Sequence, residues 1–259
     1  MGDSDNVLSN LERMFPVFQP LFDLARQLAK PEVRAALAKA FKNFEQHIRE
    51  EEQVFLDFIV KHGWIGLEHY VTSEQLRLFV KAETESGPEA ADNLVCACFP
   101  AETIEGIIFG WKQIPYFQAR KQVCDDVNRA YQTGMHSLVI ATLLPCAEGI
   151  CAGVEGADPK SVHAVQNAAK KVRFSSEIDA DFGAAMIAVI ENSYYRRTDF
   201  GVPESGFNRH RILHGRSADY ATPANSIRAI LLVQTAVGLY QSIAEEAEQI
   251  RRNGQTQKA

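Results

Sequence analysis

The chain has 259 residues, of which 46% are hydrophobic and 23% charged, and it carries a formal net charge of −6. These values are typical of a globular protein and exclude a disordered, collagen-like or multiply membrane-spanning chain. The excess negative charge lies in residues 1–100, with 10 basic and 16 acidic side chains, whereas residues 101–259 hold 17 of each. An acidic chain of this kind is no general nucleic-acid coat, so any phosphate-binding surface must be local.

The first ten residues are acidic and polar, unlike a secretory signal, which begins with basic residues followed by an apolar core. The longest apolar stretches, such as 227–239, are broken by polar residues before they reach the ~20 residues that cross a bilayer. We therefore expect a cytoplasmic protein without a membrane partner. The number of cysteines is odd and no two form a CxxC pair, which favours reduced, buried thiols over a disulfide framework or a zinc site. The cysteines are Cys96, Cys98, Cys124, Cys146 and Cys151.

Residues 1–110 predict a helical accessory region. Pro16 and Pro20 interrupt an apolar-periodic stretch over residues 6–29, which predicts two short helices or one broken helix. A long amphipathic helix is expected to begin at Pro31, and its apolar stripe is core or interface: Leu37, Ala40, Phe41, Phe44, Ile48, Phe55, Phe58 and Ile59. Glycines and prolines divide the rest, up to Trp111, into shorter helices: Gly63, Gly66, Gly87, Pro88 and Pro100.

Residues 115–252 predict a second helical region after a joint at Ile114 and Pro115. Helices are expected over residues 119–130, from about Gly134 to Gly149 with a bend at Pro145, over residues 178–195, and from Pro223 to about 252. Thr222 is the expected N-cap of the last helix. The inward-facing residues of the first helix are Val123, Val127 and Ala130. No alternating run is long enough to indicate a strand, so the predicted class is all-α.

The segment 196–216 is locally basic, with a net charge of +3. It holds five arginines and two histidines against Asp199 and Glu204. The planar guanidinium of arginine suits phosphate oxygens, and histidine moves protons near neutral pH. Metal-free cleavage of a phosphodiester needs these groups: a base for the ribose 2′-hydroxyl, an acid for the leaving 5′-oxygen and a cation for the charge on phosphorus.

The heptad from Arg209 to Gly215 resembles the Arg, polar residue, x3, His motif of the HEPN (higher eukaryotes and prokaryotes nucleotide-binding) superfamily, which includes metal-independent ribonucleases and toxins. Three further segments resemble bacterial HEPN-like proteins: 129–136, 143–149 and 219–226. The resemblance covers about residues 115–252.

This resemblance implies a helical bundle that dimerises, so that the motifs of two protomers face each other in one cleft. Arg209 would clamp the phosphate, His214 would act as general base or acid, and His210 would orient the reactants or share that role. Five residues of a regular helix advance ~7.5 Å and turn ~140°, so Arg209 and His214 of one protomer do not share a face. A two-fold axis or a local break in the helix would allow both to contribute to one cleft. The other side chains that would contact RNA are Arg197, Arg211, Arg216 and Tyr220. Glu148 would support the site.

Other interpretations of these residues stay open. His210 and His214 are four residues apart and could bind a metal, although Arg211 stands where the glutamate of an HExxH motif would be and nearby arginines repel a cation. His214 and Gly215 could simply end a helix. Glu148 could be a structural partner in a buried ion pair.

The sequence thus predicts a metal-independent, cofactor-free endoribonuclease of the toxin or phage-defence type. It would act as a homodimer on RNA, leave a 2′,3′-cyclic phosphate and have a possible antitoxin or other protein partner. The alternative is a non-catalytic helical RNA-binding or protein-interaction module. In that case Arg209 and His214 would be structural, and the acidic N-terminal helices would bind a partner.

Overall fold

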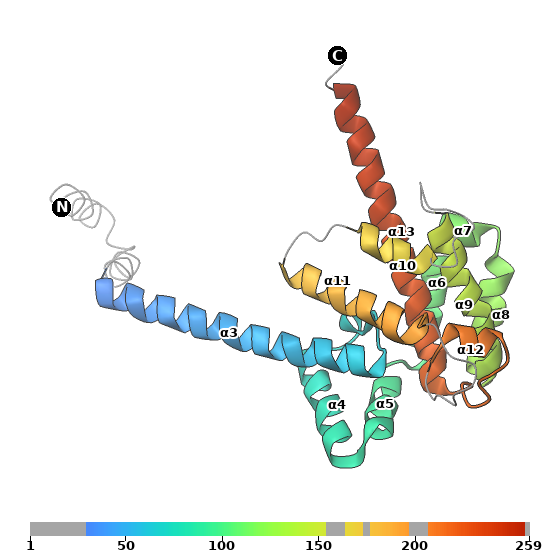
Figure 1. The fold of residues 1–259 in the computed structure, drawn as a ribbon, viewed down its shortest axis with the longest axis horizontal. Helices are drawn as coiled ribbons and strands as arrows, with labels where there is room; N and C mark the ends of the chain where they lie inside the picture. Colours follow the sequence, from blue (N-terminus) through green and yellow to red (C-terminus); the bar gives the residue numbers. More distant parts are fainter. Residues whose placement is uncertain (1–29, 154–163, 173–176, 197–206, 257–259) are drawn as a thin grey trace, which may run out of the picture. The chain divides into compact units, whose positions relative to one another are not determined.

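The computed structural model describes residues 30–153, 164–172, 177–196 and 207–256, and within these ranges every regular element is a helix (Figure 1). The prediction of an all-α protein is therefore confirmed. The helices predicted over residues 6–29, and Arg197, lie outside these ranges.

The chain divides into two compact units, Met1–Gln53 and Val54–Ala259. The boundary predicted near residues 110–115 falls inside the second unit. Of the first unit, the structure describes the N-terminal part of α3 (Pro31–His62), which begins at Pro31 as expected. In this part Leu37, Phe41 and Ile48 are 39%, 69% and 40% exposed, so these positions of the predicted stripe are not core.

The second unit contains the end of α3 and the remaining helices. In chain order they are η2 (Leu67–His69), α4 (Ser73–Ser86), α5 (Pro88–Ala97), α6 (Ala101–Trp111), α7 (Pro115–Gln118), α8 (Lys121–Gln132), α9 (His136–Ala152), α10 (Ala164–Lys171), α11 (Glu177–Val189), the π-helical turn η3 (Ile190–Tyr194), α12 (Arg209–Leu213) and α13 (Pro223–Thr256).

Local capping sets several of the helix boundaries. The Thr72 hydroxyl accepts the N–H of Gln75, whose side chain accepts the N–H of Thr72, so α4 begins with a capping box. Thr222 caps α13 by accepting the N–H of Asn225 at 3.1 Å, and Pro223 follows as the first helical residue, as the sequence predicts. α9 continues through Pro145 without a break.

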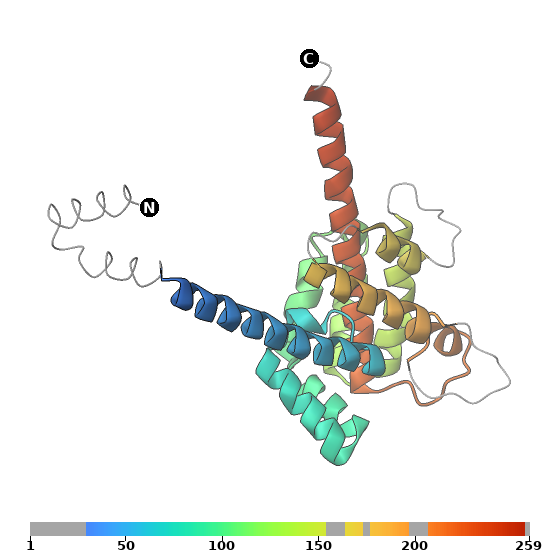
Figure 2. The ribbon, with the colours of Figure 1, turned by 60° about the vertical axis from the view of Figure 1, so that its left-hand side comes forward.

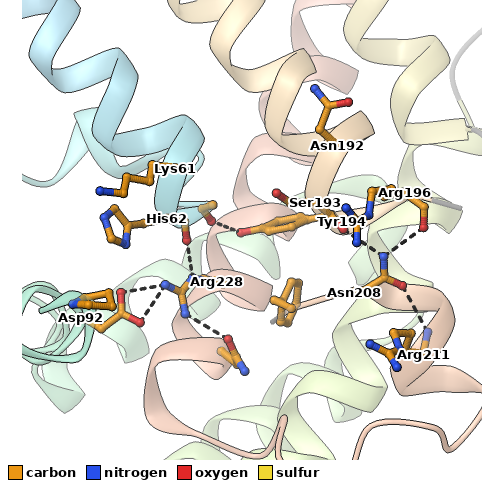
Figure 3. A pocket seen from close by; sticks show the side chains of 14 residues that line it. Lys61, His62, Asp92, Asn192, Ser193, Tyr194, Arg196, Asn208, Arg211 and Arg228 are labelled. Carbon is orange, nitrogen blue, oxygen red and sulfur yellow. Dashed lines mark hydrogen bonds and ion pairs between the residues drawn. The ribbon is translucent and has the colours of Figure 1, made fainter. Parts of the chain in front are cut away.

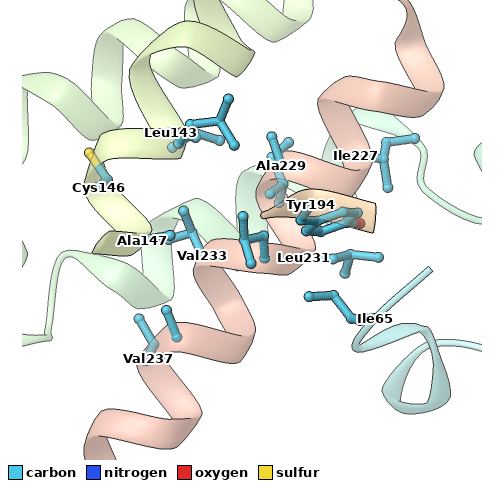
Figure 4. Close-up of a cluster of buried hydrophobic side chains, with 14 of the residues drawn as sticks. Ile65, Leu143, Cys146, Ala147, Tyr194, Ile227, Ala229, Leu231, Val233 and Val237 are labelled. Atoms are coloured by element: carbon cyan, nitrogen blue, oxygen red, sulfur yellow. The ribbon is translucent and has the colours of Figure 1, made fainter. Parts of the chain in front are cut away.

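The core of the second unit is built around the N-terminal half of α13, which packs along α9 (Figure 4). Leu231, Val233 and Val237 of α13 are at most 3% exposed, as are Leu143 and Ala147 of α9. Because every residue from 229 to 233 is fully buried, this half of α13 is apolar on all sides. The C-terminal half of α13 extends beyond the other helices of the unit (Figures 1 and 2).

Residues 223–253 of α13 are long and apolar enough to cross a membrane, and α5 and α6 pass the same test together although they are bent by 69°. In this structure 56% of the most apolar window of α13 is buried within the protein. A buried core helix of a soluble protein has the same length and composition. The part of the chain that the structure describes thus gives no indication of a many-span membrane protein.

The cysteines are free thiols, and Cys124, Cys146 and Cys151 are buried. Burial raises the pKa of the Cys124 thiol to about 11 and that of Cys151 to about 12, because a thiolate is poorly solvated in the core. These side chains are neutral near pH 7 and pack as small apolar groups.

Candidate functional site

The basic motif lies on α12, a single helical turn whose start is fixed by Asn208. The Oδ1 of Asn208 accepts the N–H of Arg211 at 3.2 Å, which caps the turn. Its Nδ2 donates to the carbonyls of Ser193 and Arg196, each at 3.0 Å. Asn208 therefore ties the beginning of α12 to the end of the π-helical turn η3.

The turn ends at His214 in a Schellman motif. Gly215 has a φ of 66°, the N–H of Arg216 donates to the carbonyl of Arg211 at 2.8 Å, and the N–H of Gly215 donates to that of Ile212 at 3.0 Å. The backbone of His214 and Gly215 therefore ends a helix, as one of the alternative interpretations expects. The His214 residue itself is exposed, so its imidazole is accessible from solvent.

Glu148 of α9 pairs with Arg209, the first residue of α12. Nη2 of Arg209 donates to Oε2 of Glu148 at 2.9 Å. Nε also lies 2.6 Å from Oε1, as an ionic contact without hydrogen-bond geometry. The two side chains are 17% and 21% exposed, so the pair is mostly shielded from water and holds the guanidinium in one orientation.

A second contact links Arg209 to the histidines. Nη1 of Arg209 lies 3.2 Å from Nδ1 of His210. A guanidinium can only donate, so Nδ1 must accept, and the neutral His210 ring then carries its proton on Nε2. The His210 and His214 rings are nearly parallel, with 6° between their planes and 6.4 Å between their centroids. We call these four residues, Glu148, Arg209, His210 and His214, the motif row.

The other predicted RNA contacts are not all at the surface. Arg216 is exposed and Tyr220 is partly buried. Arg211 is only 7% exposed and lines a pocket beside α12. Tyr194 and Tyr195, which precede the basic segment in the sequence, are 1% and 3% exposed, so neither ring is available to stack on a base.

A second polar cluster, which the sequence did not predict, surrounds Arg228 of α13 (Figure 3). Nη2 of Arg228 donates to both carboxylate oxygens of Asp92, at 2.7 and 2.9 Å. Nη1 donates to Oδ1 of Asn225 at 3.0 Å, and Nε donates to the carbonyl of His62 at 3.1 Å. The guanidinium also lies 4.0 Å from the centre of the Trp64 ring, whose N–H donates to Asp92. The only sequence signal is an arginine within the apolar run of α13.

The π-helical turn η3 lies between these clusters. The sequence predicts one helix over residues 178–195, but α11 ends at Val189 and the chain widens into η3. The Tyr194 hydroxyl donates to the carbonyl of Gly63, and the Tyr194 ring packs edge-on against Phe207. The Gly63 carbonyl and the Phe207 ring, which lie outside η3 in the sequence, therefore both contact the widened turn. Such turns often accompany functional sites.

Comparison with known proteins gives no relative. No family model, curated protein or solved structure is significantly similar to this chain. The function must therefore be argued from the chemistry of the motif row.

Proposed function

We propose that the protein is a metal-independent endoribonuclease of the HEPN-like, toxin or phage-defence kind, acting in the cytoplasm as a homodimer. The observation that supports this proposal is the motif row, in which one arginine is oriented by a carboxylate and contacts His210, whose ring lies nearly parallel to that of His214. The row combines a cation for phosphate with groups that move protons.

The roles within the row follow from its contacts. Arg209 has five N–H groups, and its hydrogen bonds to Glu148 and His210 use two of them. Others on Nη1 and Nη2 can bind a phosphate oxygen. His210 offers Nε2–H as a donor, which suits it to orient the phosphate. The exposed His214 is the group that transfers the proton.

The chemistry needs two proton transfers. The ribose 2′-oxygen attacks the adjacent phosphorus and gives its proton to a neutral imidazole. The bond from phosphorus to the 5′-oxygen breaks as that oxygen takes a proton from an imidazolium, which leaves a 2′,3′-cyclic phosphate and a 5′-hydroxyl. One exposed His214 per protomer supplies one of these groups. The same residue of a second copy would supply the other, which is the reason to propose a homodimer.

The test is cleavage of a mixed RNA pool in EDTA by the wild type, His214→Gln and Arg209→Gln. We expect cyclic-phosphate ends from the wild type and a loss of rate of about 10²- to 10⁴-fold in His214→Gln, because proton transfer is removed. His69→Gln is the matched control, since the His69 side chain is 72% exposed and outside the row. His214→Gln should also relieve any toxicity that the wild type shows on expression, whereas His69→Gln should not. Cleavage unchanged in His214→Gln, or absent from folded wild type under every ionic condition, would refute the proposal.

The second candidate is a non-catalytic helical RNA-binding or protein-interaction module. Two observations favour it: Glu148 already neutralises Arg209, and the backbone of His214 caps α12. In this case Arg209→Gln lowers the melting temperature while no RNA cleavage is detected with either protein. Gel-shift binding of RNA in EDTA then distinguishes an RNA-binding module from one that binds only proteins.

A further inference from the structure

An exposed apolar stripe runs along the part of α3 that belongs to the first unit. Its members are spaced by four, three and four residues, the spacing of a coiled-coil seam: Leu37, Phe41, Phe44 and Ile48. Phe41 is 69% exposed, and Leu37 and Ile48 are exposed as well. The sequence predicts that the stripe is core or interface, and this exposure favours an interface.

The stripe fits a second copy of itself. Steps of four, three and four residues are the same in both chain directions, so all four positions match when two copies of α3 pair antiparallel. Leu37 of one copy then faces Ile48 of the other, so aliphatic meets aliphatic. Phe41 likewise faces Phe44, so aromatic meets aromatic. The two-fold axis of this pair passes between residues 42 and 43.

The charges of α3 select this antiparallel direction. Residues 31–42 hold three basic and one acidic side chain, a net charge of +2, whereas residues 43–54 hold one basic and four acidic side chains, a net charge of −3. Antiparallel pairing places the positive half of each helix along the negative half of the other. Parallel pairing would place like charges together, which is unfavourable.

The charge difference does not depend on the side chains of α3 that have other interactions, namely Arg34, Arg49, Glu51 and Glu52. Without them, Lys39 and Lys42 against Glu32 leave the first half at +1. Glu45 and Glu50 leave the second half at −2. The two halves of the helix therefore keep opposite signs.

We propose that α3 pairs with α3 of a second copy of this chain, as an antiparallel coiled coil anchored by Phe41. One pair of helices buries less surface than the roughly 1,600 Å² of a standard protein interface, so the association should be weak and reversible. The motif row lies in the second unit, so this pairing is a further property of the chain and does not rest on RNA cleavage.

The first test is analytical ultracentrifugation of the full chain at about 1–100 µM, the range that a weak interface requires. We expect the wild type to associate, and Phe41→Ser to weaken this association about tenfold or more, because the anchor is lost. The matched control is Phe109→Ser on α6, since Phe109 is 62% exposed and lies outside the stripe. This control should stay within about twofold of the wild type. Added salt should weaken the association of the wild type.

A second test uses cysteine cross-linking to determine the direction of the pair. Cys96→Ser and Cys98→Ser first remove the partly exposed thiols. In this background a mixture of Leu37→Cys and Ile48→Cys should form a disulfide between positions 37 and 48, identified from the linked tryptic peptides. Neither variant alone should cross-link, because the two copies of either position lie ~16 Å apart along an antiparallel pair.

Three results would overturn the proposal. A wild type that stays monomeric over the whole range would show that another part of the same chain, or nothing, covers the stripe. Cross-links from Leu37→Cys alone would show a parallel pair. Association unchanged in Phe41→Ser would mean that another surface joins the copies. RNA cleavage that is lost in His214→Gln would still support the ribonuclease in each of these cases, so the two proposals fail separately.

Discussion

The ion pair between Asp92 and Arg228 makes a sharp prediction about stability. The Arg228 side chain is 9% exposed and that of Asp92 is 24% exposed. In Asp92→Asn the amide still offers an oxygen to the Trp64 N–H, but the charge that balances Arg228 is lost. Removing one partner of a buried pair costs about 3–5 kcal/mol, since the other charge stays buried. We expect about 3 kcal/mol, the low end of that range, because water reaches part of Asp92.

The assay is urea denaturation followed by circular dichroism, with Asp126→Asn as the matched control. The Asp126 side chain is 56% exposed and 3.8 Å from Arg129, so its loss should cost less than about 1 kcal/mol. For a unit of this size, about 3 kcal/mol corresponds to a fall of about 6–12 °C in melting temperature. If Asp92→Asn were as stable as Asp126→Asn, Arg228 would not depend on Asp92 and this reasoning would be refuted.

Three further predictions concern backbone strain, protonation and thiol reactivity. Gly66→Ala should destabilise the fold by about 1–2 kcal/mol in thermal unfolding, because φ is 75° and a Cβ would lie 3.0 Å from Thr235 Oγ1, whereas Gly106→Ala has open space and should be neutral or stabilising. Burial lowers the pKa of His136 below its ordinary value of 6.5, so the unfolded chain takes up this proton first as the pH falls. The free energy of unfolding should therefore decrease below about pH 6.5, and in urea titrations His136→Asn should show a smaller decrease. Since burial raises the pKa of Cys151 to about 12, this thiol should resist a thiol reagent in the native protein and react after unfolding, as followed by mass spectrometry.

The sequence predicts those helices whose ends are set by local chemistry. Pro31 begins α3, and Thr222 with Pro223 begins α13, because caps and prolines act within one turn. It does not predict η3, since that turn depends on Tyr194 reaching Gly63, a residue distant in the chain. The apolar spacing around Phe41 predicts a helix face but not its burial, because spacing does not show whether another element packs on that face.

In the candidate site too, the sequence identifies residues that are close together in the chain and not those brought together by the fold. Arg209, His210 and His214 are close in sequence, so one motif identifies them, and the resemblance that includes segment 143–149 adds Glu148. The partners of Arg228 are separated from it by up to 166 residues, and no spacing rule connects them. Asn208 was missed for a different reason: it is an ordinary N-cap locally, and its importance comes from the carbonyls of η3 that it also binds.

A double-mutant cycle on Glu148 and Arg209 tests whether this pair only stabilises the fold or also positions the guanidinium. The single variants are Glu148→Gln and Arg209→Gln. Because both side chains are about four-fifths buried, we expect a coupling energy of about 1–3 kcal/mol in urea denaturation. The exposed pair Lys81 and Glu85, one helical turn apart, is the control and should couple by about 0.5 kcal/mol or less.

The same variants separate the two functional proposals. If Glu148 positions Arg209 against a phosphate, Glu148→Gln lowers kcat for RNA cleavage while KM changes little, because the loss is felt mainly in the transition state. A large coupling in stability, together with RNA cleavage that is unchanged in Glu148→Gln, would mean that the pair only joins α12 to α9. A coupling no larger than that of the surface pair would refute the claim that Glu148 fixes the guanidinium at all. Arg209 would then be free to reorient, and the motif row would lose the preorganised cation on which its chemistry depends.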